Sequence, residues 1–224
     1  MGIEDSLVKA IASWREETGA LSEILRAIAD AGLLKGAVLV ALAIAAALWR
    51  WRGGSIFASS NAFLIRFSIA AVSAIAAARV LQHLLPHRDR PFVEFSIWGA
   101  GSKFGAENSF PSDHAAYMSA MATATFFADR KLGMIALAWT FIVILIPRVL
   151  LNYHYPTDIM AGALIGALIA FAIMKAPAPP SVARLAADAE ARAPHIIYPL
   201  AFIFAFEMAS NFNSVRAIAS ALLK

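Results

Sequence analysis

The chain has 224 residues, of which 60% are hydrophobic and only 15% are charged, and it contains no cysteine. This composition excludes disulfides, cysteine nucleophiles, thiolate zinc sites and iron–sulfur clusters, and it indicates an integral membrane protein. The net charge of +4 is modest. Because no long run of basic residues occurs, the sequence does not favour nucleic-acid binding.

The first predicted element is an amphipathic helix within residues 1–31. Apolar side chains such as Leu7, Ile11 and Trp14 recur at helical spacing over residues 5–30, with acidic residues between them. This segment is too polar to cross a membrane. We expect it to lie on the membrane surface or to pack on the bundle.

Apolar stretches follow, each close to the length of about 20 residues that a spanning helix needs. They lie near residues 33–49, 62–86, 111–128, 132–151, 157–175 and 194–209. We therefore predict an all-α integral membrane protein, a bundle of about six transmembrane helices. Residues 32–175 are expected to form the membrane core. Residues 176–224 are expected to form a polar linker, up to about residue 193, and a last helix.

The basic residues predict the orientation of the bundle. With six spans, one side of the membrane receives Arg50, Arg52, Arg130, Lys131, Lys175, Arg184 and Arg192. The positive-inside rule makes that side cytoplasmic. The N-terminus and the loops that carry the motifs described next then lie outside.

Three short segments at the outer ends of the apolar stretches each carry several ionisable residues. They read His87-Arg-Asp-Arg-Pro91, Pro111-Ser-Asp-His114 and Arg148-x5-His154-x3-Asp158. Ionisable groups at membrane depth are costly and are therefore functional candidates. Arginine binds phosphate as a fork, and histidine transfers protons or attacks phosphorus. The combination predicts phosphoryl chemistry at a membrane surface.

Each motif also has a purely structural interpretation. Asp158 lies in the first turn of a helix begun by Pro156, where it can cap the helix or reach back to His154 and fix its tautomer. Ser112 or Asp113 can cap the N-terminus of the apolar helix that follows it, near residues 111–128.

The free N–H groups of that helix would also bind a phosphate, with His114 placed to protonate a leaving oxygen. The segment 87–91 could simply hold lipid headgroups. We interpret Glu94, Lys103, Glu107 and Asn108 as solvated loop residues rather than headgroup contacts. Gly162 and Gly166 form a G-x3-G pattern that predicts close helix packing.

The three motifs resemble those of the type 2 phosphatidic acid phosphatase superfamily, which read Lys-x6-Arg-Pro, Pro-Ser-Gly-His and Ser-Arg-x5-His-x3-Asp. Order and spacing agree over about residues 79–158. The chain differs in having His83 in place of the lysine, Asp113 in place of the glycine and Pro147 in place of the serine. The sequence Phe-Pro-Ser-Asp-His at 110–114 is similar to the bacterial undecaprenyl pyrophosphate phosphatase branch.

The resemblance implies a lipid phosphatase of the bacterial inner membrane with its active site facing the periplasm. Undecaprenyl pyrophosphate is the first expected substrate, and phosphatidylglycerol phosphate, phosphatidic acid and lipid A are the alternatives. His154 would attack phosphorus and form a phosphohistidine, Asp158 would orient it, and His114 would protonate the leaving oxygen and then activate water.

The implied phosphate-binding residues are Arg90, Arg148, Ser112, Asp113, His83 and Arg88. Asp113 would contribute through nearby backbone N–H groups. Arg79, His87 or Arg88 could substitute for the missing lysine contact. The resemblance implies no metal and no other cofactor.

Three alternatives stay open. The first is a phosphotransferase that passes the phosphate to another lipid. The second is a zinc enzyme whose ligands would be His83, His114, His154 and Asp158. The third is a lipid-binding or transport protein without catalysis. The sequence does not give the oligomeric state.

Overall fold

The structure is a computed structural model that describes residues 2–51, 54–57, 59–97 and 107–222. Helices make up 82% of it, and the described residues contain no strand, which confirms the all-α prediction. The helices of the N-terminal half are α1 (Ile3–Glu17), α2 (Gly19–Asp30), η1 (Leu33–Ala37), α3 (Val38–Arg50), α4 (Ser59–Leu84) and α5 (Pro91–Glu94). The others are α6 (Asp113–Ala128), α7 (Arg130–Trp139), η2 (Thr140–Leu145), α8 (Ile146–Leu150), α9 (Pro156–Lys175), α10 (Pro180–Arg192), α11 (Pro194–Ala209) and α12 (Asn213–Leu222).

The helices that could cross a membrane are fewer than predicted. Among the described residues, three segments are long and apolar enough: Ala62–Leu84, Arg130–Leu150 and Pro156–Lys175. A fourth is obtained if α2 and the segment Leu33–Trp49, which meet at a bend of 61°, are counted as one span. The count of about six is not confirmed, because α6 and α11 have 16 residues each and would reach only about 24 Å.

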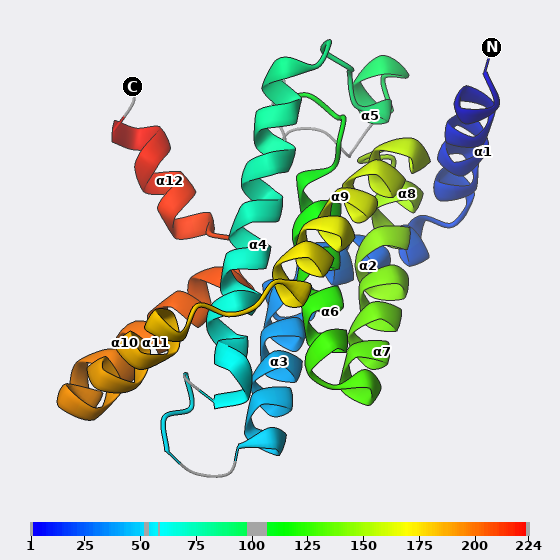
Figure 1. Cartoon of the computed structure of the whole chain (residues 1–224). Helices are drawn as coiled ribbons and strands as arrows, with labels where there is room; N and C mark the ends of the chain where they lie inside the picture. The colour runs from blue at the N-terminus through cyan, green and yellow to red at the C-terminus, as the bar shows by residue number, and fades with distance from the viewer. Residues whose placement is uncertain (1, 52–53, 58, 98–106, 223–224) are drawn as a thin grey trace.

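Helix α6 lies at the centre of the bundle, between α3, α4, α7 and α9 (Figure 1). Its small side chains are buried on nearly every side. A Cβ atom added at Gly162 would lie 2.3 Å from the Ser112 carbonyl oxygen, and one at Gly166 would lie 1.9 Å from that of Ala116. The predicted close packing at G-x3-G is confirmed, and it fixes α9 against the start of α6.

One arginine within a spanning helix has a structural role. Arg66 of α4 is buried, and its guanidinium donates hydrogen bonds to the carbonyl oxygens of Ile173 and Ala176. These carbonyls lie at the C-terminal end of α9, where the helix has no further N–H groups to satisfy them. Arg66 therefore completes the end of α9 that is remote from the motifs.

The N-terminal region forms two helices rather than the single one predicted, because the chain breaks at Thr18. Hydrogen bonds connect helix α1 to the loop before His154. Arg15 is buried and donates to the Leu151 carbonyl oxygen and to Asn152 Oδ1, each at 3.2 Å. Asn152 Nδ2 in turn donates to the Val8 carbonyl oxygen at 3.1 Å.

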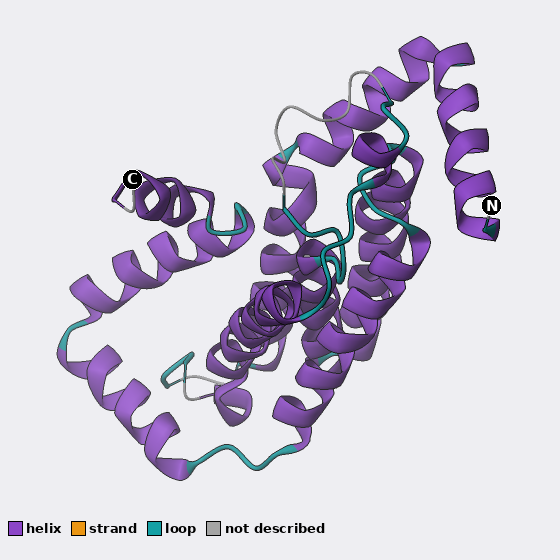
Figure 2. Cartoon of the chain, turned by 90° about the horizontal axis from the view of Figure 1, so that it is seen from above, coloured by secondary structure: helices purple, strands orange, loops and turns teal. Residues whose placement is uncertain are grey.

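The C-terminal region also differs from the prediction, since most of the expected linker is the helix α10. Helix α10 leads away from the bundle and α11 returns to it, so that the two form an arm (Figures 1 and 2). Where α11 ends, its backbone meets the bundle. A Cβ atom added at Gly36 would lie 2.2 Å from the Ala209 carbonyl oxygen.

Candidate active site

All three motifs meet at one end of the bundle, where α4 and α8 end and α6 and α9 begin (Figure 1). Backbone hydrogen bonds join them directly. Ser112 N donates to the Asp158 carbonyl oxygen at 3.1 Å, and Ser109 N donates to the Arg88 carbonyl oxygen at 2.9 Å. The motifs therefore form one structural unit although they span some seventy residues of sequence.

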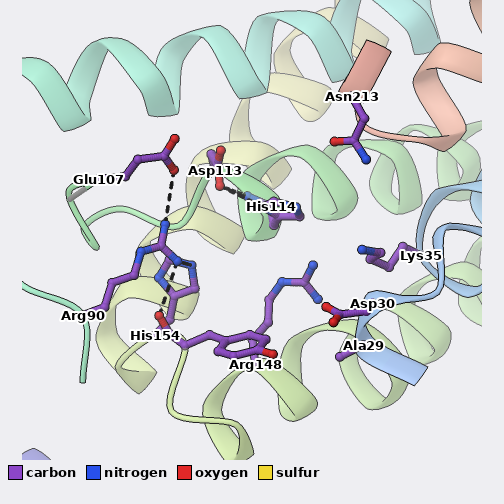
Figure 3. A pocket seen from close by; sticks show the side chains of 11 residues that line it. Ala29, Asp30, Lys35, Arg90, Glu107, Asp113, His114, Arg148, His154 and Asn213 are labelled. Atoms are coloured by element: carbon purple, nitrogen blue, oxygen red, sulfur yellow. Dashed lines mark hydrogen bonds and ion pairs between the residues drawn. The ribbon is translucent and has the colours of Figure 1, made fainter. Parts of the chain in front are cut away.

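A cavity of about 300 Å³ opens at this end (Figure 3). Five of the predicted site residues line it: Arg90, Asp113, His114, Arg148 and His154. Polar residues that carry no predicted site role line it too: Asp30, Lys35, Glu107, Tyr153 and Asn213. The lining is rich in nitrogen donors from arginine, histidine and lysine, which suits an anionic ligand.

The hydrogen bonds of His154 define its tautomer. The buried imidazole has Nδ1 3.1 Å from the Ser109 carbonyl oxygen and Nε2 3.1 Å from Arg90 Nη1. A carbonyl oxygen only accepts and a guanidinium only donates. Nδ1 therefore carries the hydrogen, and Nε2 presents its lone pair beside Arg90 in the cavity. This is the tautomer that a histidine nucleophile needs.

The surroundings of His154 also keep it neutral. Burial lowers the pKa of the imidazole, and the Arg90 guanidinium lowers it further, against the opposing effect of the nearby Asp158 carboxylate. The lone pair on Nε2 is therefore present at neutral pH.

Asp158 is fully buried behind His154 and has several donors. It accepts hydrogen bonds from the Ser109 hydroxyl, from Tyr155 N at 3.0 Å and from Arg88 Nη1 at 2.8 Å. Its distance to His154 Nδ1 is 3.6 Å. The carboxylate thus caps α9, as one interpretation predicted, and its hydrogen-bonded link to His154 runs through Ser109.

The sequence analysis missed Ser109. The residue is fully buried, its carbonyl oxygen holds His154 and its hydroxyl holds Asp158. Its only sequence signal is its place directly before the Phe110-Pro111 step of the second motif.

Arg88 does not line the cavity. Besides Asp158, its guanidinium contacts Glu4 Oε2 at 2.8 Å and Thr157 Oγ1 at 2.9 Å, and it lies 3.7 Å from the centre of the Tyr155 ring. Glu4 also accepts from Thr157 N at 3.1 Å. Arg88 therefore holds Asp158 in place and ties α1 to the start of α9.

His114 is held between two side chains. Its Nδ1 lies 2.9 Å from Asp113 Oδ1, and its Nε2 lies 3.1 Å from Nδ2 of Asn211, in the turn between α11 and α12. The carboxylate requires a hydrogen on Nδ1, so Nε2 accepts from the Asn211 amide. Asp113 is also paired with Arg79 at 2.6 Å. Its carboxylate thus orients His114, a role that the sequence analysis did not assign to it.

Besides Arg88, two further predicted phosphate ligands, Ser112 and His83, do not line the cavity. Ser112 is fully buried, and its hydroxyl caps α6 by accepting from Ala115 N at 3.3 Å. His83 is exposed at the end of α4, while its neighbour Gln82 is buried and donates to the Pro111 carbonyl oxygen at 2.8 Å. The helix therefore turns position 83 outward, and Arg79 one turn earlier faces the second motif.

The described residues beside the second motif make specific contacts. Asn108 is buried and donates to the Gln82 carbonyl oxygen at 2.9 Å, so its interpretation as a solvated residue was wrong. Glu107 lies 3.4 Å from Arg79 and 3.6 Å from Arg90. Glu94 accepts a hydrogen bond from the Tyr155 hydroxyl. Lys103 lies outside the described residues.

The zinc hypothesis requires several histidine and carboxylate side chains grouped around one point. Within the described part of the chain, no three or more histidine, aspartate or glutamate side chains are grouped so that they could hold a metal ion.

Comparison with known families matches residues 63–179 to the PAP2 superfamily. The chain belongs to this superfamily. The match covers all three motifs and confirms the resemblance that they carry. It does not include the residues before α4 or those beyond residue 179, and both of these regions contribute side chains to the cavity, among them Lys35 and Asn213.

Two curated relatives are similar to the chain. One is "Putative undecaprenyl-diphosphatase YbjG" of Escherichia coli (strain K12), 31% identical over 137 residues, or 60% of this chain and 65% of the relative. The other is "Bacitracin transport permease protein BcrC" of Bacillus licheniformis, 34% identical over 113 residues, or 49% of this chain and 55% of the relative. The chain thus covers less than two thirds of either relative. No solved structure matches it.

Proposed function

We propose that this protein is a membrane lipid phosphatase that removes the terminal phosphate of a lipid diphosphate, with undecaprenyl pyrophosphate as its first candidate substrate. The observation that carries the proposal is the tautomer of His154, whose Nε2 lone pair lies beside Arg90 in a cavity that also holds His114. Membership of the PAP2 superfamily and the relative named as an undecaprenyl-diphosphatase support the reaction class.

In the proposed first step, His154 Nε2 attacks the terminal phosphorus. A phosphorus–nitrogen bond forms and the bond to the bridging oxygen breaks, giving a phosphohistidine. The positive charge that develops on the imidazole is stabilised through Nδ1 by the Ser109 carbonyl oxygen, with the Asp158 carboxylate behind it. His114 protonates the departing oxygen. Arg90 and Arg148 hold the phosphoryl oxygens, each donor contributing roughly 3–4 kcal/mol in the transition state.

In the second step, His114 takes a proton from water, and the water oxygen attacks phosphorus. A phosphorus–oxygen bond forms, the phosphorus–nitrogen bond to His154 Nε2 breaks, and phosphate is released. His114 must therefore alternate between two protonation states. Asn211 can serve both, because its amide nitrogen donates to neutral Nε2, and its Oδ1 is buried and without a partner among the described residues. A rotated amide would accept from the protonated ring. We assign Asn211 as the positioning residue of His114.

The motif end of the bundle is proposed to face the outside of a bacterial inner membrane, since the seven basic residues that define the cytoplasmic side all lie outside the three motifs. The proposed chemistry uses no metal, because arginine side chains supply the positive charge. Phosphatidylglycerol phosphate, phosphatidic acid and lipid A are the alternative substrates.

The proposal is tested by phosphate release from the detergent-purified protein in excess EDTA. The substrates are undecaprenyl pyrophosphate and the three alternative lipids, with His154→Ala as the control. Release that persists in EDTA and disappears in the variant supports the metal-free histidine mechanism, and the preferred lipid names the substrate.

Loss of activity in EDTA with recovery on adding zinc would favour the metal enzyme instead. Transfer of the labelled phosphate to an added lipid would favour the phosphotransferase. Tight lipid binding with no turnover of any substrate would favour a binding or transport protein.

A further inference from the structure

The side chains that line the cavity fall into two groups, on either side of His114 (Figure 3). The group that we call the inner lobe contains Arg90 and His154. The group that we call the outer lobe contains Asp30, Lys35 and Asn213. The Arg148 side chain reaches between the two lobes in the same view. The proposed chemistry uses the inner lobe, and it assigns no role to the outer one.

The outer lobe is built by two segments outside the family match. Lys35 lies in the π-helical turn η1, at the 61° bend that follows α2. This turn is held from two sides: Trp139 Nε1 donates to the Leu34 carbonyl oxygen at 2.8 Å, and Gly36 touches the Ala209 backbone. Asn213 follows four residues after that contact, so the packing that fixes the bend also brings the start of α12 to the cavity.

The position of His114 relates the outer lobe to the leaving group. In phosphoryl transfer the attacking and leaving atoms lie roughly in line with phosphorus. If the phosphorus lies beside Arg90 and His154, the oxygen that His114 protonates points away from His154. Whatever that oxygen is bound to must then lie beyond His114, where the outer lobe begins.

The chemistry of the outer lobe suits a charged leaving group. When a lipid diphosphate loses its terminal phosphoryl group, the leaving group is a charged lipid monophosphate. When a lipid monophosphate is the substrate, the leaving group is an uncharged alcohol. Lys35 supplies an ammonium group and Asn213 an amide donor beside the single carboxylate of Asp30, and the Arg148 guanidinium, between the lobes, adds positive charge from the side of the transferred phosphate. Ammonium, guanidinium and amide N–H groups are the donors that bind phosphate oxygens. An uncharged alcohol would give them no anionic partner.

We propose that the outer lobe binds the phosphate that stays on the lipid, and that Lys35 and Asn213 thereby select diphosphates over monophosphate esters. This inference rests on the proposed function. It explains why the bend after α2 and the start of α12 lie together, since the bend brings Lys35 and α12 brings Asn213 to the same lobe.

The test compares two substrates that differ only in that phosphate, farnesyl diphosphate and farnesyl monophosphate, by kcat/KM in detergent. Lys35→Met keeps the length of the side chain and removes its charge. We expect the ratio of the two kcat/KM values to fall about tenfold, as for one lost charge-assisted contact. Lys35→Arg should retain most of the preference. Lys131→Met, exposed at the start of α7, is the matched control and should leave the ratio unchanged.

The outcomes separate this inference from the proposed function. If Lys35→Met lowers both activities equally, or changes neither, the outer lobe does not bind the second phosphate. If the wild-type protein hydrolyses neither substrate, the proposed function fails first and the inference falls with it. Thermal unfolding of each variant distinguishes lost selectivity from lost folding.

Discussion

The region matched by the PAP2 superfamily and the segments that flank it contribute to the site in different ways. The matched region holds the proposed reacting groups in buried positions fixed by hydrogen bonds, such as those of His154 with Ser109 and Arg90. The flanking segments contribute from a helix bend, which brings Lys35 to the cavity, and from a left-handed turn, which brings Asn211 to His114. The region matched by the family model thus carries the three motifs, while the segments outside it complete the wall of the cavity.

The largest effect is expected where the core is most tightly packed. Gly166→Ala places a Cβ atom 1.9 Å from the Ala116 carbonyl oxygen, so α9 must move away from α6. We expect a loss of roughly 3 kcal/mol or more in the free energy of unfolding, together with loss of activity. Thermal unfolding in detergent measures it. Gly19→Ala, where nothing lies within 4 Å of the added atom, is the control and should be nearly neutral. Equal stability of both variants would show that the helices are not in such close contact.

The next effect concerns the link between Asp158 and His154. Ser109→Ala removes the hydroxyl that donates to Asp158 and keeps the carbonyl oxygen that holds Nδ1. We expect kcat to fall about tenfold or more, because a buried carboxylate loses a donor beside the developing imidazolium. Steady-state kinetics measures it, with Ser109→Thr as the variant that retains a hydroxyl. An unchanged kcat in Ser109→Ala would contradict a role for this link.

A smaller effect is expected from the C-terminal flank. Asn211 has a φ of 59°, so Asn211→Gly keeps the backbone relaxed while it removes the amide that contacts His114. We expect kcat to fall roughly fivefold, the size of one neutral hydrogen bond, with little change in KM. If kcat is unchanged, the turn between α11 and α12 has no part in orienting His114. The region matched by the family model would then position His114 without help from the C-terminal flank.

The smallest effect is a displacement of the pH profile. Since burial and Arg90 lower the pKa of His154 from 6.5, the acid limb of kcat/KM should have its midpoint below pH 6.5. Activity is lost as pH falls through this pKa, because protonation removes the lone pair. Arg90→Gln should move the limb to higher pH, and Asp158→Asn should move it to lower pH. Shifts in the opposite directions would contradict the assignment of this limb to His154.

The sequence predicted the motif residues better than it predicted their surroundings. One cavity is lined by Arg90, His114, Arg148 and His154. Their roles could be predicted because each motif has a fixed spacing and lies at the end of a helix. His83 shows the limit of spacing alone: the phase of α4 turns it outward, and that phase depends on packing against other helices.

Ser109, Lys35 and Asn211 could not be predicted, for a different reason. Each is an ordinary polar residue whose role depends on a contact between distant segments, such as Gly36 with Ala209. The predicted count of about six spanning helices is not confirmed, since apolar stretches do not show where a helix stops and both α6 and α11 end after 16 residues.

The central claim is that His154 carries the phosphoryl group. The most direct measurement mixes the protein with a lipid diphosphate labelled in its terminal phosphate, quenches the reaction within milliseconds in alkali and locates the label by peptide mass spectrometry. We predict label on His154 that is stable in alkali and lost in acid, and none in His154→Gln. Hydrolysis by the wild-type protein without protein-bound label, together with hydrolysis that survives in His154→Gln, would contradict the account.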